Sequence, residues 1–469
     1  MGGVLLSARS FSGKSITEWK KDGNMLILSA DLGTSSVKMS VLDEELNLLA
    51  SAKVDYQIRV LNGDWVELDA DVVFSAMIAG IRNLSRYAGQ IGLIGFDAFS
   101  PSMTLMDAEG DALYPILTHL DRRSKEQTKE ILQVMGKDRF QHITGIQPFT
   151  GGASITSAMW IKENVPEVFQ KADHLGHLNT YIYKKLTGVW ATDPTNASMM
   201  GMYETLTGTG WSREICETFG IPLRLLPEIR DAGVIAGYLT EKAADLCGLR
   251  AGIPVAVGSN DAATAQIGAG NTHAGDILDI SGSSEMVSIL TDQPKADDRY
   301  YLRNACTPGM WQIFAITTSG FAIDWFRNEF YKDMDQDTFF NHEVPEVIGS
   351  HIDHCEVGFL PYINGDRQSL TPKRGGFTGL TLNATRKDFL ASIFLGIHEP
   401  ILDTIRICEG FMKLNKTIKL TGGMLTPQFI ELKRKLFTGY AFEVKLDCPI
   451  IGNAILALAG LRNERKAIL

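Results

Sequence analysis

Near the start of the chain, one aspartate stands between an apolar run and a turn of small hydroxyl-bearing residues. The segment reads ILSADLGTSSVKMSVLDEE, in which Asp31 is followed by Gly33, Thr34, Ser35 and Ser36. Such a turn exposes backbone N–H groups and its hydroxyls add further donors, so that it can hold phosphate oxygens. The carboxylate can hold Mg²⁺ directly or through water. The alternative is an ordinary β-turn beside an exposed acid.

A second segment repeats this pattern later in the chain. It reads ILDISGSSEMVSILTDQ, with apolar residues on both sides of the turn formed by Gly282, Ser283 and Ser284. Two such turns on opposing domains would hold one polyphosphate from both sides. A chance likeness of two hairpins is the alternative, but hydroxyls at the same place in both turns favour an internal duplication.

A third segment, GSNDAATA, places Asp261 where an apolar run meets the start of a small-residue helix. A carboxylate there can act as a general base that takes a proton from an attacking hydroxyl. A helix N-terminus favours the ionised form that a base requires. The alternative is a helix-capping aspartate, which is common.

A fourth segment, LTGGML, contains two adjacent glycines after an apolar run. Gly422 and Gly423 carry no side chains, so the backbone there can approach a flat ring such as adenine closely. Taken alone, a Gly-Gly pair is most often a turn.

The elements that must position these residues alternate between strands and helices. Predicted strands lie at 26–31, 37–42 and 92–96. The apolar spacing over residues 69–88 predicts a helix capped by Asp69 or Asp71. A further strand breaks at Gly258 before the helix of Asp261.

The pattern of the first hairpin, at residues 27–45, returns in the second, at residues 277–293, and this repeat gives the predicted domain organisation. It places a boundary near residues 268–274 and indicates two similar α/β halves that face each other across a cleft. Residues 331–356 are rich in Asp, His and Glu, and we interpret them as a polar surface loop.

Length, charge and cysteine content limit the class of protein. The 469 residues suffice for two or three domains. A net charge of -10 argues against a general nucleic-acid binder, and six widely spaced cysteines fit the reduced thiols of a cytoplasmic protein. Apolar runs stay short of the roughly 20 residues that span a bilayer. We therefore expect no nucleic-acid or membrane partner, and residues 1–24 to be a flexible extension.

The four segments, in this order, resemble the FGGY carbohydrate kinases, a family within the actin, Hsp70 and hexokinase superfamily. Residues 31–38 are similar to the first phosphate motif, GSND to the base motif, and the two later glycine turns to the second phosphate and adenosine motifs. The most specific match is GGFTGLTLNATRKDFLASIFLG at 375–396, which departs at Leu395, where the family usually has an acid. The resemblance covers roughly residues 26–461.

The resemblance implies two ribonuclease H-like domains of the actin-like ATPase kind flanking a catalytic cleft. Residues 25–270 would form the sugar-binding domain and residues 271–469 the nucleotide-binding domain. The enzyme would transfer a phosphoryl group from ATP, with Mg²⁺, to a sugar hydroxyl.

The resemblance also implies roles for particular residues. Asp261 would be the catalytic base, and Asp31 and Asp261 would hold the metal. The sugar contacts would be Asp97, Asp121, Arg123 and Asp261. The ATP contacts would be Gly33, Thr34, Ser35, Ser36, Lys38, Gly282, Ser283, Ser284, Gly422, Gly423 and Met424.

The identity of the acceptor stays open at this stage. Phe99, Ser100 and Pro101 stand where xylulose kinases usually carry G-Q-M-H. A pentulose such as xylulose is the first candidate, and fuculose, glycerol, erythritol or gluconate are alternatives. The rival from another class is a non-catalytic, nucleotide-dependent sugar-binding or scaffold protein. A homodimer is an alternative to a monomer.

Overall fold

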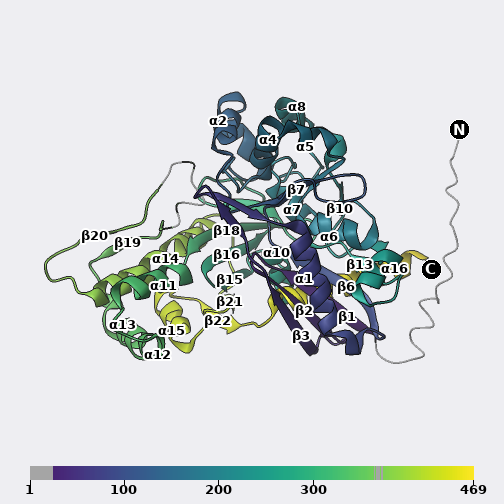
Figure 1. Ribbon diagram of the computed structural model, residues 1–469. Helices are drawn as coiled ribbons and strands as arrows, with labels where there is room; N and C mark the ends of the chain where they lie inside the picture. The colour runs from purple at the N-terminus through teal and green to yellow at the C-terminus, as the bar shows by residue number, and fades with distance from the viewer. Residues whose placement is uncertain (1–24, 364, 366–369, 371–372, 469) are drawn as a thin grey trace, which may run out of the picture.

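The computed structural model describes residues 25–363, 365, 370 and 373–468. The predicted N-terminal extension, residues 1–24, lies outside this described part of the chain. Figure 1 shows two halves side by side, each built around its own large mixed sheet. The chain passes from the first half to the second after α10 (Asp261–Gly268).

The first sheet consists, in spatial order, of β12 (Ile235–Tyr238), β13 (Pro254–Ala256), β6 (Ile91–Ala98), β1 (Leu26–Leu32), β2 (Ser36–Leu42) and β3 (Leu48–Asp55), with β14 (Ser259–Asn260) also beside β6. β1, β2 and β3 form an antiparallel meander, and β6 runs parallel to β1. β13 in turn runs parallel to β6. Helices cover both faces, which is why β1 and β6 are buried along nearly their whole length.

The second sheet consists of β17 (Tyr301–Asn304), β18 (Trp311–Thr318), β16 (Ser284–Thr291), β15 (Ile277–Ser281), β21 (Thr417–Thr421) and β22 (Ala441–Val444). β15, β16 and β18 form an antiparallel meander, and β21 and β22 continue in parallel on the other side of β15. A three-strand meander followed by two parallel strands is therefore the plan of both sheets. This shared plan supports the predicted duplication.

The helices pack mainly on the two large sheets. On the first, α1 (Ala70–Asn83), α6 (Leu178–Thr187) and α9 (Glu241–Cys247) lie on one face and α16 (Cys448–Ile468) on the other. On the second, α14 (Arg386–Glu409) lies against β16 and β18, beside α11 (Gly320–Phe330), α13 (Val344–Ser350) and α15 (Pro427–Leu436).

An additional layer extends the first half at the top of Figure 1. Its sheet consists of β4 (Arg59–Leu61), β5 (Trp65–Leu68), β8 (Ile116–Thr118), β7 (Ser102–Met106) and β9 (His174–Gly176). Its helices are α2 (Lys125–Val134), α3 (Lys137–Thr144), α4 (Ser154–Asn164), α5 (Pro166–Lys171), α7 (Pro194–Met199) and α8 (Arg213–Phe219). The short pairs β10 (Ala191–Thr192) with β11 (Glu228–Ile229) and β19 (Gly358–Leu360) with β20 (Gly376–Thr378) complete the strands.

The last helix of the chain returns to the first half. In α16, Ile450, Ala454 and Ala457 pack against Ile27 and Leu93 of the first sheet. The division into residues 25–270 and 271–469 remains a prediction, and it did not anticipate that α16 lies on the first sheet.

The helices α10 and α16 approach each other closely through two glycines. A Cβ atom at Gly268 would lie 1.8 Å from the carbonyl oxygen of Cys448, and one at Gly452 would lie 2.2 Å from that of Thr264. Both distances are far below any van der Waals contact, so only glycine permits this packing. The packing fixes α10, and with it Asp261, against the last helix.

We therefore predict that Gly268→Ala destabilises the fold by about 3 kcal/mol, because the methyl group must push two backbones apart. Chemical denaturation of the two proteins measures this difference. Gly349→Ala in α13 is the matched control, because a Cβ atom there would meet nothing within 4 Å. Equal stability of the two variants would contradict the prediction.

Most of the local predictions are confirmed. The three predicted strands are β1, β2 and β6, and the predicted helix is α1. Asp69 caps α1 and accepts from the backbone N–H groups of Asp71 at 2.9 Å and of Val72 at 3.4 Å.

The predicted surface loop at 331–356 is wrong. The segment contains α12 (Gln336–Thr338), a π-helical turn at Phe339–Glu343 and α13. Phe339, Val344 and Val347 are buried in the core of the second half, and the polar residues between them hide this helical spacing.

Candidate active site

Three aspartates converge at one edge of the first sheet. Asp31 in β1 and Asp97 in β6 are direct register partners on neighbouring parallel strands. Ser259 in β14 also pairs with Asp97, and Asp261, two residues on, begins α10 at the same edge. In open α/β sheets, the carboxyl ends of parallel strands form the crevice that binds ligands.

Asn260, and not Asp261, supplies the side chain that caps α10. Asn260 caps α10, because its side-chain oxygen accepts from the backbone N–H groups of Ala262 and Ala263, both at 3.1 Å. The alternative in which Asp261 is the capping residue is therefore wrong. Asp261 accepts a hydrogen bond from the N–H of Ala262 at 2.7 Å.

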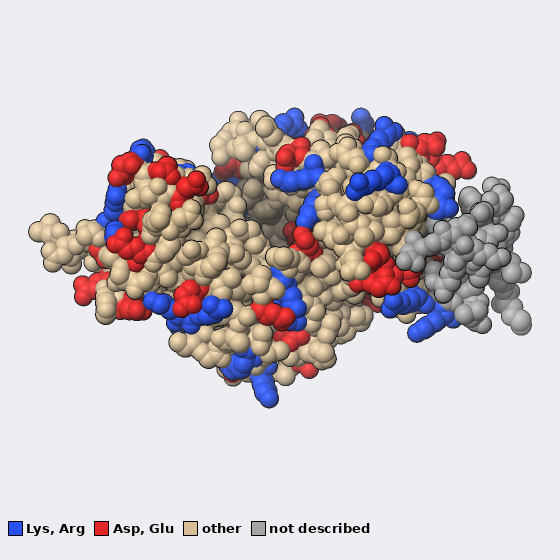
Figure 2. Space-filling model, turned by 90° about the horizontal axis from the view of Figure 1, so that it is seen from below, with Lys and Arg blue, Asp and Glu red and all other residues tan. Residues whose placement is uncertain are grey.

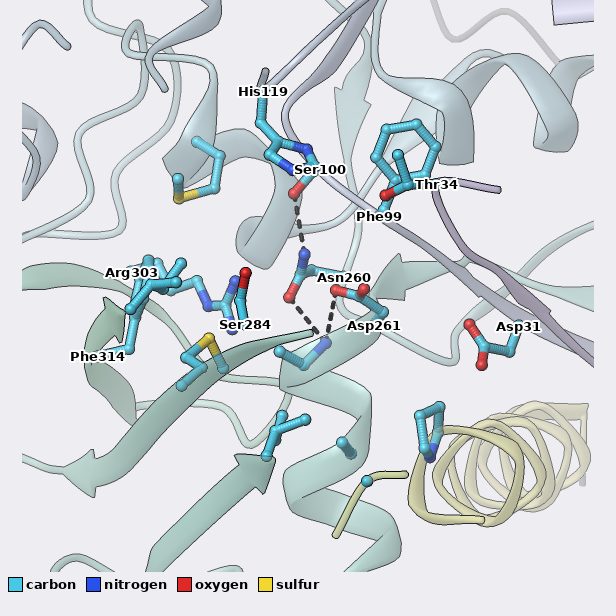
Figure 3. A pocket seen from close by; sticks show the side chains of 18 of the residues that line it. Asp31, Thr34, Phe99, Ser100, His119, Asn260, Asp261, Ser284, Arg303 and Phe314 are labelled. Carbon is cyan, nitrogen blue, oxygen red and sulfur yellow. Dashed lines mark hydrogen bonds between the residues drawn. The ribbon is translucent and has the colours of Figure 1, made fainter. Parts of the chain in front are cut away.

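A pocket of about 630 Å³ opens between the two halves. Figure 2 shows the surface hollowed at this place, between the second half on the left and the first half on the right. Five of the predicted site residues line it: Asp31, Thr34, Asp261, Ser284 and Gly422. Figure 3 shows Asp261 in the middle of this group, with Asp31 to one side.

The two predicted phosphate turns close in the same manner. The N–H of Gly33 donates to the carbonyl of Ser36, and the N–H of Gly282 donates to that of Ser284, both at 2.9 Å. The second turn is one residue shorter, since Ser281 pairs with Glu285 whereas Leu32 pairs with Val37. Thr34 and Ser284 bring the two turns to opposite walls of one pocket.

The glycine pair lies against the second turn. Gly422 has a φ of 115°, and a Cβ atom there would lie 2.2 Å from the carbonyl oxygen of Ser281. The N–H of Met424 donates to that same carbonyl at 3.1 Å. Gly422 therefore brings the end of β21 against the end of β15, where it lines the pocket.

The other residues predicted to contact ATP lie beside the pocket and do not line it: Gly33, Ser35, Ser36, Lys38, Gly282, Ser283, Gly423 and Met424. Lys38 forms an ion pair with Asp447, which precedes α16 and does line the pocket. Asp447 is distant from Lys38 in the sequence, and its carboxylate pairs with the Lys38 ammonium group.

Asp97 lies behind the pocket. It is fully buried, and Nδ2 of Asn453 in α16 donates to its Oδ2 at 2.6 Å. Among the described residues, its Oδ1 has no hydrogen-bond partner. In this structure Asp97 anchors α16 to the first sheet.

Asp121 and Arg123 also lie outside the pocket. The Arg123 guanidinium contacts both Asp121 and Glu67 at 2.9 Å and stacks on Trp65 and Trp160. The side chains of both Asp121 and Arg123 are fully buried. The structure gives this pair a structural contact, and nothing in it supports their predicted contact with a sugar.

Burial is the main cause that raises the pKa values of these three carboxylates. Burial, and then the charge of Asp31, raises the pKa of Asp261 to about 6, although the N–H of Ala262 and the charge of Arg303 oppose the rise. Burial raises the pKa of Asp31, with Asp97 and Lys38 opposing. Burial, Asp31 and Asp261 raise the pKa of Asp97 well above its ordinary range.

Ionised Asp261 should therefore destabilise the folded chain. The folded state binds the proton more tightly than the unfolded state, whose pKa is 3.8, so the destabilisation is complete above pH 6 and vanishes as the pH falls toward 4. Asp261→Asn should raise the free energy of unfolding by about 3 kcal/mol at pH 8 and leave it nearly unchanged at pH 4. Denaturation in metal-free buffer at both pH values measures this, with the exposed Asp245→Asn as control. An equal effect at both pH values would contradict the prediction.

The sequence reasoning missed several lining residues, among them His119, Arg303 and Asp447. Arg303 left one signal, because it is the charged residue in the segment YYLRN, which contains the buried strand β17. His119 and Asp447 stand in loops without a motif.

The donor set fits a metal ion that takes most of its ligands from phosphate and water. Within the described residues, no group of three or more His, Cys, Asp or Glu side chains is placed to bind a metal. Asp31 and Asp261 nevertheless line one pocket. Mg²⁺ is commonly held by one or two carboxylates together with substrate phosphates.

None of the described helices is long and apolar enough to cross a membrane.

Two α/β halves that share one strand plan, with a pocket between them, have the two-domain fold of the actin-like ATPases. Residues 26–268 match the N-terminal domain of the FGGY family of carbohydrate kinases. The chain belongs to this family of sugar kinases.

Curated relatives and solved structures agree with this family. The xylulose kinase of Lactococcus lactis is 26% identical over 450 residues, covering 92% of this chain and 87% of that protein. The xylulose kinase of Staphylococcus xylosus is 24% identical and covers 92% and 90%. The structure titled gluconate kinase from Lactobacillus acidophilus superposes with a TM-score of 0.86 at 22% identity, covering 94% of this chain and 90% of that one. The structural likeness shows the fold.

Proposed function

We propose that the protein transfers the γ-phosphoryl group of ATP to a hydroxyl of a small polyhydroxylated acceptor, with Asp261 as general base. The observation that carries this proposal is that Asp261, Asp31 and the two glycine–hydroxyl turns meet in one pocket. Phosphoryl transfer relies on alignment and charge stabilisation, which such a pocket can supply from two walls.

Residues in different parts of the pocket would carry out different parts of the transfer. Asp261 accepts the proton of the acceptor hydroxyl, and the small side chains of Ala262 and Ala265 leave room beside it. The turns that carry Thr34 and Ser284 offer backbone N–H groups and hydroxyls to phosphate oxygens from opposite sides. The pocket lies between the halves, so their approach would exclude water that competes as acceptor.

Asp31 and Asp261 would hold Mg²⁺, which would offset the negative charge of the phosphates. Because Asp31 raises the pKa of Asp261, a cation between the two carboxylates would also favour the ionised base. We also retain the division into residues 25–270 and 271–469, although α16 of the second part packs on the first sheet, and we propose a cytoplasmic location.

A pentulose such as xylulose is the first acceptor to test, because the two relatives named above are xylulose kinases. The test is ADP release by the purified protein with ATP, Mg²⁺ and a panel of about thirty sugars, polyols and sugar acids. ADP release that depends on one acceptor is expected. Silence across the panel, together with retained nucleotide binding, would overturn the kinase and favour the non-catalytic sugar-binding alternative.

A further inference from the structure

Arg303 faces the pocket from the second sheet. Along a strand, alternate side chains point to the same face. On this face lie Tyr301 and Arg303 of β17, Phe314 and Ile316 of β18, and Met286 of β16, and all of them line the pocket. Figure 3 shows the Arg303 side chain pointing inward from beside Phe314, on the side of Asp261 away from Asp31.

The guanidinium group is buried but only partly bonded. Its Nε donates to Oε1 of Gln312 at 2.6 Å, and its Cζ lies 4.5 Å from the centre of the Phe314 ring. The residue is 3% exposed, and within the described chain its Nη2 has no hydrogen-bond partner. Burying a charged group costs free energy when one of its hydrogen-bond donors has no acceptor, and a ligand that supplies the acceptor would offset this cost.

The carboxylates that act electrostatically on Arg303 do not accept a hydrogen bond from its Nη2. None of the described acids forms an ion pair with Arg303, for which an Asp or Glu oxygen would have to lie within 4.0 Å. Asp193 is already occupied by the backbone N–H groups and side chains of Thr195 and Asn196. Asp261 acts on Arg303 from a greater distance. Burial lowers the pKa of Arg303 to about 10, with Asp261, Cys306 and Asp193 opposing, and the group remains a cation at neutral pH.

The pocket around Arg303 is largely apolar, with Phe99, Phe149 and Met199 from the first half and Met286, Phe314 and Ile316 from the second. Ser100, His119 and Ser284 are polar residues that also line the pocket. Asn260 caps α10 with its oxygen and donates its Nδ2 to Ser100 at 3.0 Å, so much of its hydrogen-bonding capacity is used. The Nη2 of this charged guanidinium, unpartnered among the described residues, suits an oxygen of a carboxylate.

We propose that Arg303 binds a carboxylate of the acceptor, so that the substrate is a polyhydroxylated acid phosphorylated at the hydroxyl next to Asp261. This inference rests on the proposed kinase function and narrows its acceptor. It favours a sugar acid over the pentulose that the relatives suggest. The same donors suit a phosphate of the nucleotide, and the experiment separates these two anions.

The experiment uses the full chain, ATP, Mg²⁺ and matched acceptor pairs. Each pair is an aldonate and the alditol of the same length and configuration, such as xylonate with xylitol and gluconate with glucitol. For at least one pair, we expect kcat/KM for the acid to exceed that for the alditol by about 100-fold, the effect of one buried charged pair. Arg303→Met should collapse this ratio, and Arg303→Lys should restore part of it. Arg139→Met, an exposed arginine paired with Glu214, is the control that should leave the ratio unchanged.

Three results would overturn the inference while leaving the kinase intact. They are a neutral sugar or alditol used better than every acid, an equal loss for acid and alditol in Arg303→Met, or a rise in the KM for ATP alone. The last would assign Arg303 to a nucleotide phosphate. If Arg303→Met does not fold, the comparison of acid with alditol in the unaltered protein decides. If no acid, sugar or alditol stimulates ADP release although ATP still binds, the proposed function itself is refuted.

Discussion

Asp261→Asn should lower the rate of phosphoryl transfer to the acceptor by about 10³-fold, the range that general base catalysis supplies. The side chain keeps its size and its place at the start of α10, because Asn260 holds the helix cap. The variant loses the ability to accept a proton and exchanges a charged ligand of the proposed Mg²⁺ site for a neutral one. Binding of ATP should be retained, since the two phosphate turns are untouched.

The measurement pairs acceptor-dependent ADP release with nucleotide binding by calorimetry. Asp245→Asn, an exposed acid in α9, should match the unaltered protein in both assays. A loss of transfer together with a loss of folding would be uninformative for catalysis, but we expect greater stability at pH 8, as argued from the raised pKa. Turnover near that of the unaltered protein would remove Asp261 from the mechanism.

Asp31→Asn should lower kcat/KM by about 10²–10³-fold, because it removes one preorganised charge from the phosphate end of the pocket. Asp31 is held at the end of β1 by its pairing with Asp97 and with Lys38 in the neighbouring strands, so asparagine should occupy the same place. The loss should appear chiefly as a higher Mg²⁺ requirement, since a carboxylate is exchanged for a neutral ligand.

A titration of activity with Mg²⁺ measures this effect. Asp55→Asn, in the edge strand β3 and paired with Lys53 at the surface, is the control. Because Asp31 is one cause of the raised pKa of Asp261, the variant should also lower that pKa. An unchanged Mg²⁺ requirement and an unchanged pKa would show that Asp31 is a structural acid.

Local signals allowed several parts of the site to be predicted. Asp31 and Asp261 each follow an apolar run, and the glycine–hydroxyl turns after residues 32 and 281 are encoded in a few adjacent residues. Strand periodicity and turn chemistry act over such short spans. The same reasoning misread residues 331–356, where polar residues masked a helical core face.

The roles of Asp97, Asp121 and Arg123 could not be decided in this way. Each is a charged residue near the end of a strand, which is also what a substrate contact would look like. Asp97 accepts a hydrogen bond from Asn453 of α16, and Arg123 lies over the rings of two tryptophans that come from other elements.

The sequence by itself determined the α/β plan of two similar halves and the sugar kinase family, and it was enough to predict the two glycine–hydroxyl turns and to propose the base. Only the tertiary structure decided that α16 packs on the first sheet and that Lys38 forms an ion pair with Asp447. It also decided that Arg303 lines the pocket with an Nη2 that has no hydrogen-bond partner among the described residues. The physical reason is range. Turns, caps and strand periodicity depend on neighbours a few residues away, whereas burial and the pairing of a charge depend on segments that meet only when the chain has folded.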